Sequence, residues 1–88
     1  MYDCELRESV EKFFHKLAKK NPKQLEMIRR KIEEIRLNPQ HYKNLRRPLQ
    51  HLKRVHIDRS FVLVFSVDES RKTVIIEDYD HHDNIYML

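Results

Sequence analysis

The sequence contains no glycine among its 88 residues. Glycine-rich phosphate loops and dinucleotide-binding fingerprints need glycine, because only a residue without a side chain lets the backbone approach a phosphate closely. Both kinds of site are therefore excluded. We expect the turns to be made by Asp, Asn, Ser or Pro instead.

Cysteine and long apolar runs are also scarce. The one cysteine, Cys4, excludes an internal disulfide and a paired-cysteine metal finger, and with no basic neighbour we expect it to be inert. No apolar run approaches the roughly 20 residues that cross a bilayer, and the opening MYDCELRE does not resemble a signal peptide. We therefore expect one cytoplasmic domain, residues 1–88, without membrane contact.

Charge is abundant but uneven along the chain. Residues 1–50 carry 13 Lys and Arg against 7 Asp and Glu, a balance of +6, whereas residues 51–88 carry 5 against 7, a balance of −2. A basic half suits a polyanion or an acidic protein partner. The alternative is that these charges only solvate two amphipathic helices.

The second half has the pattern of three strands. Apolar and polar residues alternate over 54–58, as in a half-buried strand. Residues 61–67 are apolar at both alternating sets of positions, so this strand should be central with both faces covered. A polar turn at 68–71 then leads into a third strand over 73–79.

Two helices precede these strands. Ser9 is the expected N-cap of the first helix, which runs to about Lys20. An Asn-Pro pair at 21–22 begins the second helix, and another Asn-Pro pair ends it near Leu37. The apolar residues expected to face inward are Val10, Phe13, Phe14, Leu17, Leu25, Ile28, Ile32 and Ile35.

A short edge strand over residues 2–6 completes the element order β-α-α-β-β-β. The helices have almost no linker, so they should form an antiparallel hairpin, and their apolar stripes need a sheet face to cover. The predicted fold is α+β, with the hairpin packed on one face of an antiparallel sheet. Residues 40–52 are the least regular segment.

His56 and His82 are the first candidates for chemistry. In a three-strand meander the outer strands run the same way, so both imidazoles lie at one end of the sheet, roughly 10 Å apart by two inter-strand steps. That gap is about as wide as a phosphodiester. The alternative is that both are ordinary surface residues, because six histidines in a polar chain often lie near one another.

A metal site is a further alternative at the same place. Its ligands would be His56 with Asp80, His81, His82 and Asp83. Successive residues of a strand point to opposite faces, however, so these side chains are not expected to converge. We therefore expect no metal and no cofactor.

Three short motifs lie in order along these elements: Pro48-Leu49 ahead of the second strand, HIDRSFVLVF at 56–65 and HDNIY at 82–86. In this order, over nearly the whole chain, they resemble toxins of the RelE/ParE superfamily from type II toxin–antitoxin systems. The local match is closest to RelE/YafQ-like mRNA interferases. The resemblance implies a ribosome-dependent, metal-independent endoribonuclease that cleaves mRNA and inhibits translation.

RNA cleavage without metal needs removal of the 2′-OH proton, stabilisation of charge on the phosphorane and protonation of the leaving 5′ oxygen. Histidine suits the two proton transfers and arginine the charge, while an aromatic ring can stack on a base. On this template we assign His56 and His82 to proton transfer without deciding which is the acid, Tyr86 to the nucleotide, and Arg54 to the phosphate. The expected RNA-binding residues are Arg46, Arg47, His51 and Lys53.

The chain departs from the family pattern at several of these positions. Arg47 stands where YafQ-like proteins carry a histidine, for which His51 is a nearby substitute, and Arg54 stands where they tend to carry an acid. Ser60 stands where they carry an aspartate. An arginine that many RelE members have on the middle strand is replaced by Val62 or a neighbour.

The resemblance also implies a partner, a RelB-like antitoxin that docks on the basic surface, with a heterotetramer as one form of the complex. Acidic residues of that partner would complement the basic half of the chain. Two other functions stay open. One is a non-enzymatic, ParE-like toxin that blocks a protein target, and the other is a degenerate member that only binds its antitoxin.

Overall fold

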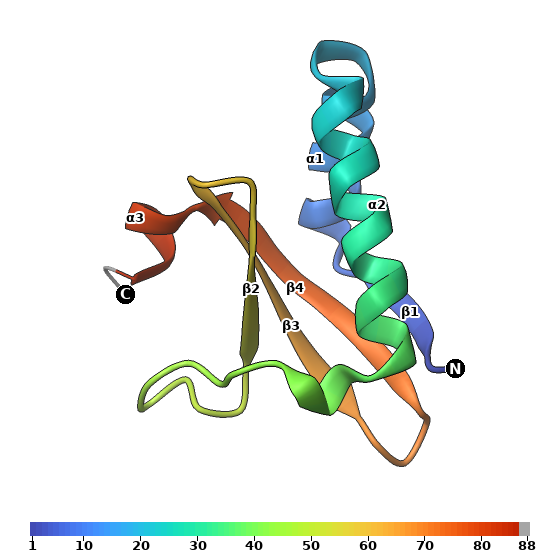
Figure 1. Cartoon of the computed structure of the whole chain (residues 1–88), viewed down its shortest axis with the longest axis vertical. Helices are drawn as coiled ribbons and strands as arrows, with labels where there is room; N and C mark the ends of the chain where they lie inside the picture. Colours follow the sequence, from blue (N-terminus) through green and yellow to red (C-terminus); the bar gives the residue numbers. More distant parts are fainter. Residues whose placement is uncertain (87–88) are drawn as a thin grey trace.

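The computed structural model describes residues 1–86, with the side chain of Tyr86 outside the described part. The elements follow the predicted order (Figure 1). They are β1 (Asp3–Leu6), α1 (Glu8–Lys20), α2 (Pro22–Leu37), the 3-10 turn η1 (Pro39–His41), β2 (Lys53–Ile57), β3 (Phe61–Asp68), β4 (Thr73–His81) and α3 (His82–Tyr86). The predicted α+β fold is confirmed, with α1 and α2 packed as a hairpin on one face of a four-stranded sheet.

The sheet has the strand order β1-β4-β3-β2 and is mixed, which corrects the expectation of an antiparallel sheet. The meander β2-β3-β4 is antiparallel as predicted, but β1 pairs in parallel with β4. The helical hairpin explains this direction, because α2 brings the chain back to its start, where the Tyr2 N–H donates to the Arg36 carbonyl at 3.0 Å. The strand β2 therefore runs in the same direction as β1. The chain reverses once between β2 and β3 and again between β3 and β4, so β4 also runs in the direction of β1.

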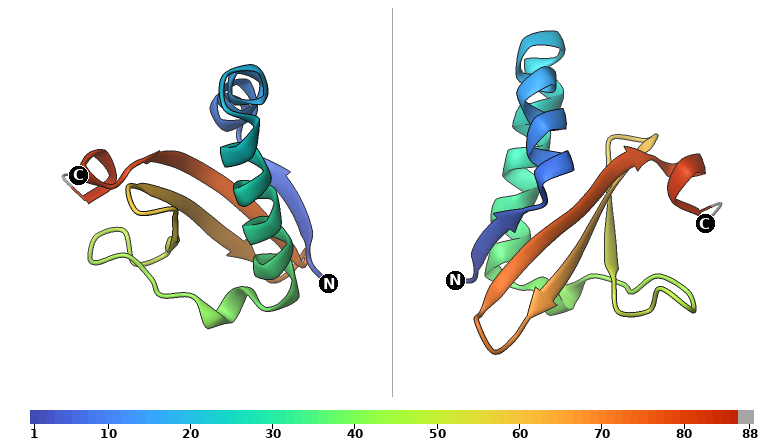
Figure 2. Two further views of the ribbon diagram at one scale, coloured as in Figure 1. Left: turned by 45° about the horizontal axis from the view of Figure 1, so that its top comes forward. Right: turned by 180° about the vertical axis from the view of Figure 1, so that it is seen from behind.

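The strand β3 is central and covered on both faces, as its sequence predicts. Val62, Leu63, Val64 and Phe65 are all buried. The helices lie over one face (Figure 2), where they form the main core, and the other face meets a smaller cluster. That second cluster is formed by Leu45, Val62, Val64 and Ile85, with Leu49 and Leu52 packed against it.

The first helix starts without the predicted serine cap. Ser9 lies inside α1, and Arg7 is the N-cap residue. The Arg7 N–H still donates to the Ile76 carbonyl in the sheet at 3.1 Å, while the Arg7 carbonyl accepts the Glu11 N–H at 3.0 Å. The strand thus passes directly into the helix, and Glu8 and Glu11 in the first turn complement the helix dipole.

The second helix has the predicted boundaries. The Asn21 side chain caps it by accepting the Gln24 N–H at 3.2 Å, and Pro22 takes the first helical position. Leu37 is its last residue, immediately before Asn38. No helix in the described residues combines the length and apolar character needed to cross a bilayer.

Phe13 departs from the predicted inward stripe. It is 39% exposed, whereas Val10, Phe14 and Leu17 are buried. The reason is that Phe13 lies at the margin of the stripe, where its ring packs beside that of Tyr79 with centroids 5.7 Å apart. The helix therefore buries one phenylalanine and leaves its neighbour at the rim.

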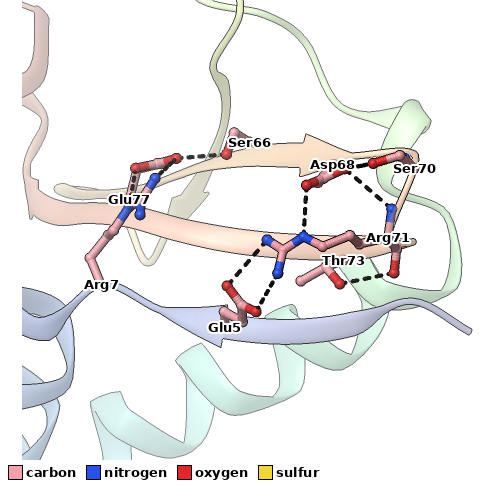
Figure 3. Close-up of polar contacts among 8 residues, drawn as sticks. All are labelled: Glu5, Arg7, Ser66, Asp68, Ser70, Arg71, Thr73 and Glu77. Atoms are coloured by element: carbon pink, nitrogen blue, oxygen red, sulfur yellow. Dashed lines mark hydrogen bonds and ion pairs between the residues drawn. The ribbon is translucent and has the colours of Figure 1, made fainter.

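In the part of the chain that the structure describes, two residues of these glycine-free turns have left-handed backbone. Asp58 (φ 57°) is of the expected type, but Lys72 (φ 50°) is not. Contacts around the β3–β4 turn hold Lys72 in this conformation, because the Asp3 N–H donates to its carbonyl at 2.9 Å and its ammonium pairs with Glu69 at 3.1 Å. The Asp68 carboxylate closes the same turn by accepting from Ser70 and Arg71 (Figure 3).

Candidate nucleic-acid site

A hollow of about 570 Å³ opens on the sheet face opposite the helical hairpin. Its apolar floor is made by Leu45, Leu49 and Ile85, which belong to or pack on the second cluster. Its rim carries three guanidinium groups and one amide, from Arg46, Arg47, Arg54 and Asn44. We call this feature the arginine hollow.

The segment between η1 and β2 builds most of the arginine hollow by lying along the outer edge of β2. Asn44 forms a bridge with Lys53, and the Arg54 N–H donates to the Lys43 carbonyl at 3.0 Å. The Leu45 N–H donates to the Leu52 carbonyl at 2.8 Å, which closes the segment into a loop. The loop extends away from the helices toward the side of the molecule that carries α3 (Figure 1).

The structure brings three of the predicted cations together at the arginine hollow. Arg46 and Arg47 come from the loop and Arg54 from β2. Two adjacent arginines and a third one 7–8 residues further along the chain thus line one hollow with an apolar floor. This combination can hold phosphate at the rim, and the aliphatic floor offers an apolar surface to the face of a base.

Lys53 and His51 are placed differently. The Lys53 ammonium donates to the Tyr42 carbonyl and to Asn44 Oδ1, both at 3.1 Å, so it holds the loop to β2. His51 does not line the arginine hollow. Its side chain is exposed. RNA binding by Lys53 and His51 stays a prediction.

His56 and His82 lie at the same end of the sheet, as the meander predicts. His56 is exposed near the end of β2, and the pairing register places it opposite Val62, which in turn lies opposite Asp80. His82 follows two residues after Asp80, and its N–H donates to the Ser60 carbonyl at 2.8 Å in the β2–β3 turn. His56 and Arg54 are two residues apart on β2, so they share the sheet face of the arginine hollow.

Asp83 joins the two neighbouring histidines. His82 Nδ1 lies 2.9 Å from Asp83 Oδ1, and His81 Nδ1 lies 3.6 Å from Asp83 Oδ2. The two rings are 4.8 Å apart. The expectation that successive residues point to opposite faces is wrong here, because β4 ends at His81 and α3 begins at His82.

Tyr86 is the last described residue and ends α3. Its side chain lies outside the described part, so its role at the nucleotide stays a prediction. The apolar floor was not among the residues assigned from the sequence. The leucines at 45, 49 and 52 could have indicated this floor, because apolar side chains in an otherwise polar segment are expected to pack on an apolar surface.

Comparison with known proteins agrees with this architecture, although no protein-family model matches the chain. A protein of Methanocaldococcus jannaschii named as a candidate toxin, RelE4, is 60% identical over 86 residues, which cover 98% of this chain and 92% of the relative.

Two solved structures share the fold. YafQ from E. coli has a TM-score of 0.72 at 16% identity, covering 98% of this chain and 99% of its own. The toxin–antitoxin complex RelBE2 from Mycobacterium tuberculosis contains a chain with a TM-score of 0.72 at 24% identity, covering 91% of this chain and 96% of that one. With 60% identity over almost its whole length to RelE4, the chain belongs to the RelE family of toxins from toxin–antitoxin systems.

Proposed function

We propose that this toxin is a metal-independent endoribonuclease that cleaves mRNA on the ribosome and so inhibits translation in the cytoplasm. The observation that carries the proposal is the arginine hollow, which lies on the same sheet face as His56 and is lined by Ile85 of α3, the helix that His82 begins. Cations and an apolar floor thus share a sheet face with His56, and the helix that begins at His82 contributes Ile85 to the same hollow.

Cleavage would proceed by attack of the ribose 2′ oxygen on the adjacent phosphorus. One of His56 and His82 takes the 2′-OH proton, and the other protonates the 5′ oxygen as the P–O bond to it breaks. The products are a 2′,3′-cyclic phosphate and a 5′-hydroxyl end. The guanidinium groups of Arg46, Arg47 and Arg54 supply positive charge where the phosphorane develops negative charge, and Tyr86 is assigned to orient the nucleotide.

A cognate antitoxin of the RelB type is the proposed protein partner. The RelBE2 structure is described as a toxin–antitoxin complex and shares this fold. An acidic segment of the antitoxin would complement the arginine hollow and cover it, which masks the site without blocking the hairpin face. Two toxins and two antitoxins would form the heterotetramer.

The test uses toxin purified without antitoxin and ribosomes that carry a defined mRNA. Cleavage is read as new 5′ ends by primer extension. We expect the wild type to cleave and His82→Ala to be slower by roughly 10²–10⁴-fold, the loss expected for one acid–base group. His41→Ala, at an exposed position of η1, is the matched control and should keep full activity. Full activity of His82→Ala would remove the assignment of His82, and no cleavage by the wild type would remove the nuclease.

One observation favours a second function, a ParE-like toxin that blocks a protein target. Val62 or a neighbour stands where many RelE members have an arginine, and Val62 is completely buried as part of the second cluster. That position therefore brings no charge to a phosphate. Expression of the toxin in growing cells distinguishes the two functions. An mRNA interferase depletes transcripts first. A toxin that blocks a protein target such as gyrase induces DNA damage while transcripts stay intact.

A further inference from the structure

The junction between β4 and α3 gathers three metal-binding side chains. His81, His82 and Asp83 each offer one ligand atom, and these atoms all lie within 4.8 Å of one another. Within residues 1–86 this is the one group of three or more such side chains that converges. The two imidazoles are each 41% exposed and the carboxylate 65%, so an ion from solvent can reach them.

The backbone around the junction holds the two histidines in place. The His82 N–H donates to the Ser60 carbonyl at 2.8 Å, and the His81 N–H donates to Asp80 Oδ1 at 2.7 Å. The same Asp80 oxygen accepts from the Asn84 amide at 3.0 Å, and the Phe61 ring packs against His81 edge-on. These contacts thus hold the chain on both sides of the point where β4 passes into α3. Side chains held in this way have less conformational entropy to lose when an ion binds.

The distances suit a small ion with short bonds. Zn²⁺ binds imidazole nitrogen and carboxylate oxygen at about 2.0–2.2 Å, which separates neighbouring tetrahedral ligands by about 3.4 Å. His82 Nδ1 lies 2.9 Å from Asp83 Oδ1 and His81 Nδ1 lies 3.6 Å from Asp83 Oδ2, on either side of that value, and all the ligand atoms lie within 4.8 Å of one another, so binding needs only a small closure of the group. His81 Nδ1 also accepts the Asp83 N–H at 3.2 Å, so this nitrogen already presents its lone pair toward Asp83.

We propose that His81, His82 and Asp83 bind one divalent transition-metal ion of the zinc class. Two imidazoles with a carboxylate match the preference of Zn²⁺, and of Co²⁺ or Ni²⁺, over the all-oxygen sites of Mg²⁺ and Ca²⁺. The ion takes the lone pair that His81 Nδ1 now directs at the Asp83 N–H, and water fills the remaining position.

Such an ion would regulate the nuclease, a consequence that rests on the proposed function, whereas the binding itself does not. His82 is assigned to proton transfer, and a nitrogen that coordinates a metal no longer accepts or gives a proton. Zinc bound at this site therefore removes one of the two acid–base groups. The expected role is inhibitory.

Calorimetric titration of the full chain with ZnCl₂ tests the site directly. We expect one ion per chain for the wild type and an affinity at least tenfold weaker for His81→Ala, since even outer-shell changes cost 10–100-fold. His15→Ala, an exposed histidine on α1, is the matched control and should bind like the wild type. Cys4 is a poor competitor, because burial raises the pKa of its thiol. Circular dichroism verifies that the variants fold.

The result that would overturn the site is equal zinc affinity of His81→Ala and the wild type, or no binding by the wild type. The regulatory consequence has its own assay. Zinc should slow mRNA cleavage by the wild type and leave His81→Ala unaffected, and EDTA should restore the wild-type rate. Equal inhibition of both proteins refutes control through this site. If the metal-free wild type does not cleave RNA, the proposed function fails while calorimetry still decides the metal site.

Discussion

Arg7 donates two hydrogen bonds to Glu77, from Nε to Oε1 at 2.8 Å and from Nη2 to Oε2 at 3.2 Å (Figure 3). The two residues are 70 positions apart, at the start of α1 and within β4. Glu77 is the extra residue of a bulge, because Val64 pairs with Asp78 and Phe65 with Ile76. The Ser66 hydroxyl also donates to Glu77, at 2.6 Å, so the carboxylate joins the hairpin to the sheet.

Glu77→Gln should lower the free energy of unfolding by about 1 kcal/mol, measured by urea denaturation. Gln keeps the shape but loses the charge, and hydrogen bonds to charged groups are worth about 1.5–3 kcal/mol before discount for the exposed Arg7. Glu8→Gln is the control, since the Glu8–Lys12 pair is exposed at both ends and should contribute less than about 0.5 kcal/mol. Equal losses in both variants would contradict a special role for Glu77.

Phe14 and Phe13 are neighbours on α1 with different surroundings. Phe14 is buried in the main core, whereas Phe13 is at the rim. Phe14→Ala should reduce the free energy of unfolding by about 3–5 kcal/mol because it leaves a cavity, and Phe13→Ala by only about 1 kcal/mol because less area is buried. Chemical denaturation of both variants measures the difference. A loss for Phe13→Ala as large as that for Phe14→Ala would show that the rim is part of the core.

Acid should weaken the β3–β4 turn through Asp68. Hydrogen bonds from the Arg71 guanidinium, and then from Ser70, lower the pKa of Asp68 from 3.8 to about 2. A lowered pKa means that the folded state favours the ionised carboxylate, so this stabilisation is complete above about pH 4 and is lost as the pH falls toward 2. The melting temperature of Asp68→Asn should lie below that of the wild type at pH 6, and the difference should shrink from pH 4 to pH 2. A difference in melting temperature that is as large at pH 2 as at pH 6 would show that the charge of Asp68 does not stabilise the turn.

RNA affinity should depend on salt through the arginine hollow. Each phosphate of a single strand that a cation neutralises contributes about 0.7 to the slope of log affinity against log salt concentration. Changing Arg46, Arg47 or Arg54 to Gln should therefore reduce that slope by about 0.7 for each phosphate that the variant no longer neutralises, measured by fluorescence anisotropy with a short single-stranded RNA. Arg29→Gln, an exposed residue of α2 paired with Glu26, is the control with the same charge change. If it reduces the slope equally, the binding surface is the helical hairpin instead.

Local pattern was sufficient for most of the secondary structure. Three features follow from residues that lie close together in the sequence. They are the helix boundary at Asn21-Pro22, the burial of Val62 to Phe65, and the position of the three-strand meander. The Ser9 cap failed because Arg7 is still bonded to Ile76 in the sheet when the helix begins. A cap depends on how the preceding strand is held, which is not a local property.

The sequence by itself determined the element order, the two amphipathic stripes and the candidate residues for chemistry, because the hydrophobic period and the residue types can be read along the chain. Only the tertiary structure decided that β1 pairs in parallel with β4, that Leu45 and Ile85 form the floor beneath three arginines, and that His81 and His82 turn to the same side. Each of these depends on contacts that local periodicity does not encode, formed between segments far apart in the sequence or at the point where a strand gives way to a helix.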